Sequence, residues 1–136
     1  MALMAITPHI KDLDSFLQQC HLRPYGRGQA IINAGDVPQT LYYIVEGTVS
    51  VYLEEEDQRE MILSYLNPGD FFGEMGLFDT RNSRSACCRA KTPCEIAEIS
   101  YEQFNNYVQQ HPDLLFTLGQ QMAKRLRNTS RKVGDL

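Results

Sequence analysis

One stretch of the chain, residues 69–89, combines the side chains and glycines that can bind a small anion. It reads GDFFGEMGLFDTRNSRSACCR and places a glycine on each side of Glu74–Met75. Glycines let a backbone approach a ligand closely and direct its amide N–H groups at it. Arg84 offers a planar fork of donors that suits a phosphate, and its charge persists at physiological pH. Ser85 adds a hydroxyl donor, and the amide of Ala86 can reach the same anion.

Glu74 is the unusual member of this cluster, because an acid repels the phosphate that an arginine would bind. It fits if its carboxylate accepts hydrogen bonds from a sugar hydroxyl and also pairs with Arg84. With Gly73 beside it, the set predicts a nucleotide pocket. A triphosphate site is not predicted, since the chain has neither a GxxxxGK[ST] motif nor an acidic pair for Mg²⁺. An internal Arg–Glu ion pair is the structural alternative.

The elements that must position this cluster are mostly β-strands. Between residues 22 and 100, short β-rich runs alternate with turn signals such as Gly35–Asp36 and Asn67–Pro68–Gly69–Asp70. This spacing is typical of an antiparallel barrel or jelly roll. The runs TVSVYLEEE and QREMILSYL form the best hairpin candidate. Before them, residues 9–20 carry apolar side chains at helical spacing.

The last part of the chain is predicted to be helical. Residues 101–111 form a short helix that ends before Pro112, and residues 112–136 form a long one. The predicted fold class is therefore mainly β with flanking helices: an antiparallel barrel or jelly roll over 1–111, then a C-terminal dimerisation helix over 112–136. The heptad seam that predicts pairing with a second copy consists of Leu115, Leu118, Met122, Leu126, Thr129, Val133 and Leu136. Packing of this helix on its own barrel is the alternative.

Two hydroxyl side chains interrupt this apolar seam. Thr129 lies on it and Ser130 is next to it, where leucine would stabilise a helix pair more. A polar residue in such a seam needs a partner or a reason. Control of helix register is the structural explanation, and a ligand that reaches the dimer interface is the functional one.

Composition and charge exclude several classes of function. The net charge of −4 does not favour binding to DNA, and the basic cluster near the C-terminus is interpreted as a solvated helix face. No apolar run is long enough to span a bilayer, and no secretory signal is visible, so a cytoplasmic protein without a membrane partner is expected. The basic cluster consists of Lys124, Arg125, Arg127, Arg131 and Lys132.

Neither a metal centre nor a catalytic site is predicted. The four cysteines have no CxxC spacing and are expected to be reduced thiols, mostly buried. The three histidines, His9, His21 and His111, lie outside the predicted strands, so no metal-binding triad of the cupin type can form. No nucleophile–base pair is visible either. The chain is therefore expected to have no catalytic residues and not to be an enzyme.

Two longer segments carry a resemblance to a known family. IINAGDVPQTLYYIVEG at 31–47 and FGEMGLFDTRNSRSA at 72–86 resemble the two signature segments of cyclic-nucleotide-binding domains. EMILSYL at 60–66, AEISY at 97–101 and the C-terminal MAKRLRNTSRKVGDL are similar to the catabolite activator protein family of bacterial transcription regulators. The resemblance covers nearly the whole chain. Pro38 departs from it, because the first signature usually has a small residue there.

The resemblance implies cAMP as an allosteric ligand and a double-stranded β-helix jelly roll with a long helix at a homodimer interface. Gly73 and Glu74 match the family's ligands for the ribose 2′-OH. Arg84 and Ser85, with Ala86 beside them, match its cyclic-phosphate ligands. Thr129 then matches the residue that bonds the adenine amino group, and Ser130 matches the residue that does so from the partner subunit.

The family usually continues into a helix-turn-helix domain, whereas this sequence stops near the hinge that precedes it. DNA and RNA polymerase are thus implied as partners only through a full-length protein. Three alternatives remain open at this stage. The effector is cGMP or cyclic di-GMP instead of cAMP, the chain is a natural stand-alone sensor, or it is a dimerisation module that needs no ligand.

Overall fold

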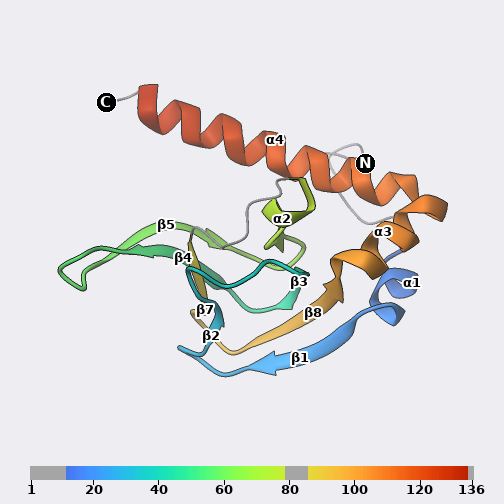
Figure 1. Ribbon diagram of the computed structural model, residues 1–136, viewed down its shortest axis with the longest axis horizontal. Coiled ribbons are helices and arrows are strands. Elements are labelled where there is room, and N and C mark those ends of the chain that lie inside the picture. The colour runs from blue at the N-terminus through green and yellow to red at the C-terminus, as the bar shows by residue number, and fades with distance from the viewer. Residues whose placement is uncertain (1–11, 79–85, 135–136) are drawn as a thin grey trace, which may run out of the picture.

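In the part of the chain that the structure describes, two four-stranded antiparallel sheets and four helices make up the fold (Figure 1). The computed structural model describes residues 12–78 and 86–134, with side chains as far as residue 128. The first sheet has the strand order β1-β8-β3-β6 and the second β2-β7-β4-β5. The elements are α1 (Leu13–Gln18), β1 (His21–Tyr25), β2 (Ala30–Ile32), β3 (Thr40–Glu46), β4 (Val49–Glu54), β5 (Glu60–Leu66), β6 (Phe71–Phe72), α2 (Met75–Phe78), β7 (Cys87–Ala90), β8 (Cys94–Ser100), α3 (Tyr101–Gln110) and α4 (Pro112–Gly134).

The first sheet is covered on both faces, because alternate residues of a strand point to opposite sides. Ile44 and Ile96 face the second sheet, where they pack in a core with Val49. Leu41 and Ile99, from the same two strands, face the helices instead. On that side the second core contains Phe16 of α1, Phe104 of α3, and Leu114 and Leu118 of α4. The sheet thereby holds the helices in place relative to the jelly roll.

The main predictions of the fold are confirmed. The jelly roll and the long C-terminal helix are both present, and β4 pairs with β5 as the predicted hairpin. The helix predicted before Pro112 spans Tyr101–Gln110 and is capped by the Ser100 side chain, which accepts from the amide of Gln103 at 3.1 Å. The helix expected over 9–20 is seen as Leu13–Gln18, and its first residues lie outside the described part.

Two strands of the first sheet were not predicted. β1 exposes most of its side chains and contains Pro24. The proline is tolerated because β1 lies at an edge of the sheet, where a missing backbone N–H need not break a ladder bond. β6 has only two residues, Phe71 and Phe72, too few for any alternation to be visible. Both strands depend on pairing with a distant partner, β8 and β3 respectively.

The predicted heptad seam divides into two parts. Leu118 is 0% exposed within this chain, and Met122 packs against the same core, so the prediction that Leu118 faces a second copy is wrong. Leu115 and Leu126 of the same seam are exposed, as is Phe116 next to it. The first half of α4 thus uses one side for its own sheet and leaves the other uncovered.

All four cysteines are free thiols. Cys87, Cys88 and Cys94 are buried in the strands, and Cys20 is half-buried after α1. Burial raises the pKa of the Cys20 thiol to about 12, because the thiolate would lose its hydration. Such a thiol stays protonated at neutral pH, which is the state of an inert structural cysteine.

Candidate functional site

The predicted ribose-binding segment is a tight turn between β6 and α2. Gly73 adopts a φ of 76°, and its carbonyl accepts a hydrogen bond from the Tyr101 hydroxyl. A Cβ on Gly76 would lie 2.7 Å from the Cβ of Pro38 and 2.7 Å from the Tyr101 ring. The glycine at 76 is therefore required by close packing within the chain, against the proline that departs from the family pattern. Packing from two sides fixes the position at which α2 begins.

Glu74 follows this turn with little exposure to solvent. The residue is 8% exposed, and its Oε1 lies 3.4 Å from Nη1 of Arg125 on α4. Arg125 also donates to the Phe71 carbonyl through Nη2. Burying a carboxylate is costly unless a cation and a hydrogen bond compensate for the lost hydration, and Arg125 supplies both. The turn and the long helix thus meet at one ion pair.

Arg125 was interpreted from the sequence as part of a solvated basic face, which is wrong for this residue. Its side chain is 31% exposed and contacts Glu74 and Phe71, whereas Lys124 and Arg127 on the same helix are exposed as expected. The contact joins residues 51 positions apart, so no local pattern could have revealed it. The only local signal is the spacing of Gln121 and Arg125, which puts both on one face of α4.

The other predicted ligands are placed only in part. Ala86 is half-buried directly before β7, a central strand of the second sheet. Arg84 and Ser85 lie outside the described residues, so the predicted pairing of Arg84 with Glu74 is not tested. Thr129 and Ser130 fall within α4, but their side chains also lie outside the described part.

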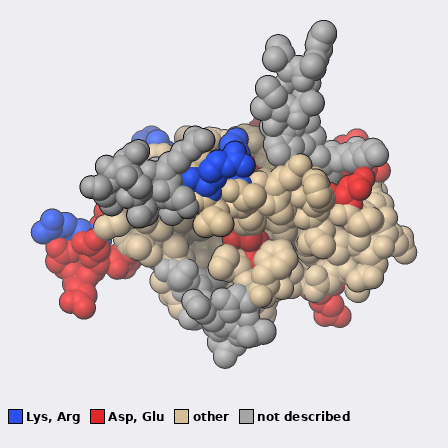
Figure 2. Space-filling model, turned by 90° about the horizontal axis from the view of Figure 1, so that it is seen from above, with Lys and Arg blue, Asp and Glu red and all other residues tan. Residues whose placement is uncertain are grey.

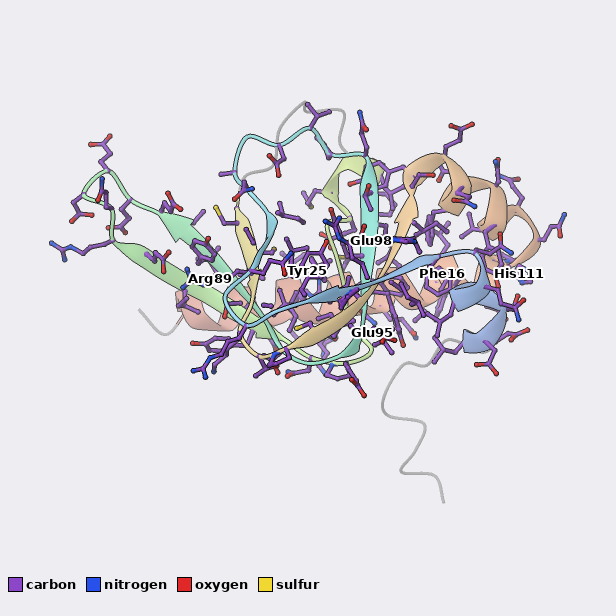
Figure 3. The ribbon with its side chains drawn as sticks, turned by 90° about the horizontal axis from the view of Figure 1, so that it is seen from below. Phe16, Tyr25, Arg89, Glu95, Glu98 and His111 are labelled. Carbon is purple, nitrogen blue, oxygen red and sulfur yellow. The ribbon has the colours of Figure 1, made fainter. Side chains whose placement is uncertain are left out.

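Charged groups elsewhere tie strands of the same sheet together. Arg89 of β7 binds Glu60 of β5 through two bonds of 2.7 and 2.6 Å and lies over the Tyr52 ring at 4.4 Å. These bonds lower the pKa of the Glu60 carboxyl. On the other sheet, Tyr25 donates to Glu98, and burial together with this carboxylate raises the pKa of the Tyr25 hydroxyl (Figure 3).

Figure 2 shows the face of the molecule that carries α4. In Figure 2 acidic side chains gather at the end of the β4–β5 hairpin, where Glu54, Glu55, Glu56 and Asp57 follow one another. Within 12–78 and 86–134, no three His, Cys, Asp or Glu side chains are arranged so that they could hold a metal ion together. No helix in this part of the chain is both long and apolar enough to cross a membrane.

Comparison with known proteins identifies the family. Residues 22–111 match the cyclic nucleotide-binding domain, and the chain belongs to this family. The predicted resemblance to catabolite activator proteins is confirmed by two relatives. The cAMP-activated global transcriptional regulator Vfr of Pseudomonas aeruginosa is 52% identical over 139 residues, which cover 100% of this chain and 65% of Vfr. The cAMP-activated global transcriptional regulator CRP of Escherichia coli O157:H7 is 52% identical over 124 residues, 91% of this chain and 59% of CRP.

Solved structures agree with this assignment. The c-di-GMP responsive global regulator CLP of Xanthomonas campestris superposes with a TM-score of 0.83 at 40% identity, over 90% of this chain and 61% of CLP. The catabolite activator protein of Thermus thermophilus gives a TM-score of 0.79 at 29% identity, over 91% and 58% of the two chains. The present chain spans less than two thirds of the length of each of these four proteins.

Replacing Arg125 by methionine is expected to destabilise the fold by about 1–3 kcal/mol, because Glu74 would stay buried without this cation; the partial exposure of the arginine limits the loss. Arg127→Met removes the same charge from the exposed side of α4 and should change the free energy of unfolding by less than about 0.5 kcal/mol. Urea unfolding of both variants measures the difference. Equal losses of unfolding free energy in the two variants would show that the Glu74–Arg125 pair does not contribute to the stability of the fold.

Proposed function

We propose that this chain is the cAMP-binding sensory and dimerisation domain of a catabolite-activator-type transcription regulator. The observation that carries the proposal is the ion pair between Glu74 and Arg125. It places the carboxylate that matches the family's ribose ligand against the helix that carries the residues matching its adenine ligands. A nucleotide bound at Glu74 would therefore lie between the jelly roll and α4.

In this proposal, different residues would bind different parts of the nucleotide. The ribose 2′-OH would be bound by Gly73 and Glu74, and the cyclic phosphate by Arg84 and Ser85, with Ala86 beside them. Thr129 would bond the adenine amino group within one subunit, and Ser130 would do so from the partner subunit. Protein donors rather than a metal would neutralise the phosphate, so cAMP is the only small-molecule ligand required. The site has no catalytic residues, because binding itself is its function.

Binding would act on the protein by shifting a population of conformations. Contacts from the nucleotide to α4 form only when the helix is extended and in register with its copy, so the ligand selects that state. In a full-length cytoplasmic regulator the helix would then reposition DNA-reading domains, and RNA polymerase would be engaged by the same assembly. The cAMP-activated relatives support this role.

A different cyclic nucleotide is the second candidate. The structural relative CLP is described as c-di-GMP responsive and is 40% identical to this chain. The relatives described as cAMP-activated are 52% identical, which favours cAMP. Thr129 supports the same choice, because its hydroxyl can accept a hydrogen bond from an adenine amino group.

Calorimetric titration with cAMP, cGMP and cyclic di-GMP tests the proposal directly. The chain should bind cAMP most tightly, and Arg84→Leu should weaken binding by at least about 100-fold, because the phosphate would be buried without its counter-charge. Arg81→Leu makes the same change nearby in the sequence at a position that matches no phosphate ligand and should bind normally. Undiminished binding by Arg84→Leu would refute the phosphate site, and tighter binding of cyclic di-GMP would establish the alternative ligand.

The exposed side of α4 supports the proposed homodimer. Leu115 and Leu126 lie on it, and Leu126 is 68% exposed. Gly119 lies between them in the heptad, and a Cβ there would meet nothing within 4 Å. An apolar stripe with an open glycine is suited to close contact with the same helix of a second copy.

Leu126→Glu is expected to convert the dimer to a monomer, since it places a charge in an apolar helix pair. Leu22→Glu is the matched control, because Leu22 is also exposed but lies on β1, on the side of the molecule away from α4 (Figure 1). Sedimentation velocity with and without cAMP measures the oligomeric state of both variants. A dimer that survives Leu126→Glu would show that α4 is not the interface.

A further inference from the structure

The open edge of β6 is closed by side chains instead of by another strand. β6 is the last strand of its sheet and pairs on one side only, with β3, where Tyr42 faces Phe72 and Tyr43 faces Phe71. The polar backbone groups on the other edge need partners of a different kind, because Phe71 is fully buried and water does not reach it.

Gln121 of α4 provides these partners. Its Oε1 accepts from the Phe71 amide at 2.9 Å, and its Nε2 donates to the Gly69 carbonyl at 2.8 Å. A carboxamide has the same acceptor and donor groups as a peptide unit, so Gln121 takes the place of a neighbouring strand residue. Gly69 is held from its other side by β3, since its amide donates to the Ile44 carbonyl at 2.9 Å.

Gln121 also touches the guanidinium that pairs with Glu74. Its Oε1 lies 3.5 Å from Nη2 of Arg125, whose Nη1 lies 3.4 Å from the Glu74 carboxylate. Gln121 therefore fixes two things at once: the backbone that leads into the turn before Glu74, and the cation that orients the Glu74 side chain. Residues 121 and 125 are one helical turn apart, so both reach the same strand edge.

We propose that Gln121 is a positioning residue for recognition of the ribose 2′-OH, acting through Glu74 without contacting the nucleotide. This proposal rests on the proposed function, in which Glu74 accepts a hydrogen bond from that hydroxyl. Loss of the Gln121 carboxamide would remove its bonds to the strand edge and its contact with Arg125, and Glu74 would no longer be held where the hydroxyl needs it. The effect should thus depend on whether the ligand has a 2′-OH.

Calorimetric titration of Gln121→Met with cAMP and with 2′-deoxy-cAMP tests this dependence. Methionine keeps the length and apolar volume of glutamine but can replace neither hydrogen bond. cAMP binding should weaken by at least about tenfold, as expected when a ligand hydrogen bond to a charged group is lost. Binding of 2′-deoxy-cAMP should weaken by less than about threefold, because that nucleotide has no 2′-OH for Glu74 to bind.

Gln120→Met is the matched control, because Gln120 is the exposed neighbour on the same helix. It should bind both nucleotides as the unsubstituted chain does. Gln121→Glu is a second variant in case methionine prevents folding. It keeps the acceptor for Phe71 but draws Arg125 away from Glu74, and it should show the same preferential loss for cAMP.

The possible failures are distinct. If the unsubstituted chain binds neither nucleotide, the proposed function itself is wrong. If the unsubstituted chain binds cAMP and the Gln121 variants weaken both nucleotides equally, Gln121 has only a general structural role and the inference is overturned. The same conclusion follows if the folded variants bind cAMP normally.

Discussion

The contact between α4 and the edge of β6 is the interaction on which the site depends. β6 is too short to be a stable strand by itself, and its outer edge would leave buried backbone groups without partners. Gln121 and Arg125 satisfy these groups from the helix, and Arg125 continues to the Glu74 carboxylate. The helix cannot move away from the jelly roll without breaking these bonds together. A change in the position of the Glu74 carboxylate would therefore also act on α4 through Arg125.

The two cores explain why this contact is held in register. The side chains of β3 and β8 alternate between the core under the second sheet and the core under the helices. Leu114 and Leu118 anchor the first half of α4 in the second of these, while Leu126, farther along, remains exposed. The helix is thus fixed at one end and open to a partner along its other side, which suits an element that links a ligand site to an assembly.

Local patterns in the sequence predicted most of the strands and both C-terminal helices. The β4–β5 hairpin and the helix end before Pro112 follow from alternation, turn residues and backbone sterics, all of which act over a few residues. Local patterns could not predict which side of α4 packs on its own sheet and which side remains exposed. Leu115 and Leu118 look alike in a heptad, and only the position of the sheet decides that Leu118 is buried.

The candidate site shows the same limit. Glu74 and Gly73 were identified from residue type and family resemblance, but the prediction gave Glu74 a different partner and missed Arg125. That contact, like those of Gln121, joins segments about 50 residues apart and exists only because β6 runs beneath α4. The glycine at 76 was read as access for a ligand, whereas the structure shows that Pro38 and Tyr101 already exclude a side chain there.

Hydrogen exchange with and without cAMP tests the central claim most directly, because it reports the opening of each segment separately. The account predicts that cAMP slows amide exchange by at least about tenfold both in residues 69–78 and along α4, since the ligand would hold these two elements together. Slower exchange in only one of them, or no change in either at saturating cAMP, would contradict the claim that the nucleotide joins the jelly roll to the helix.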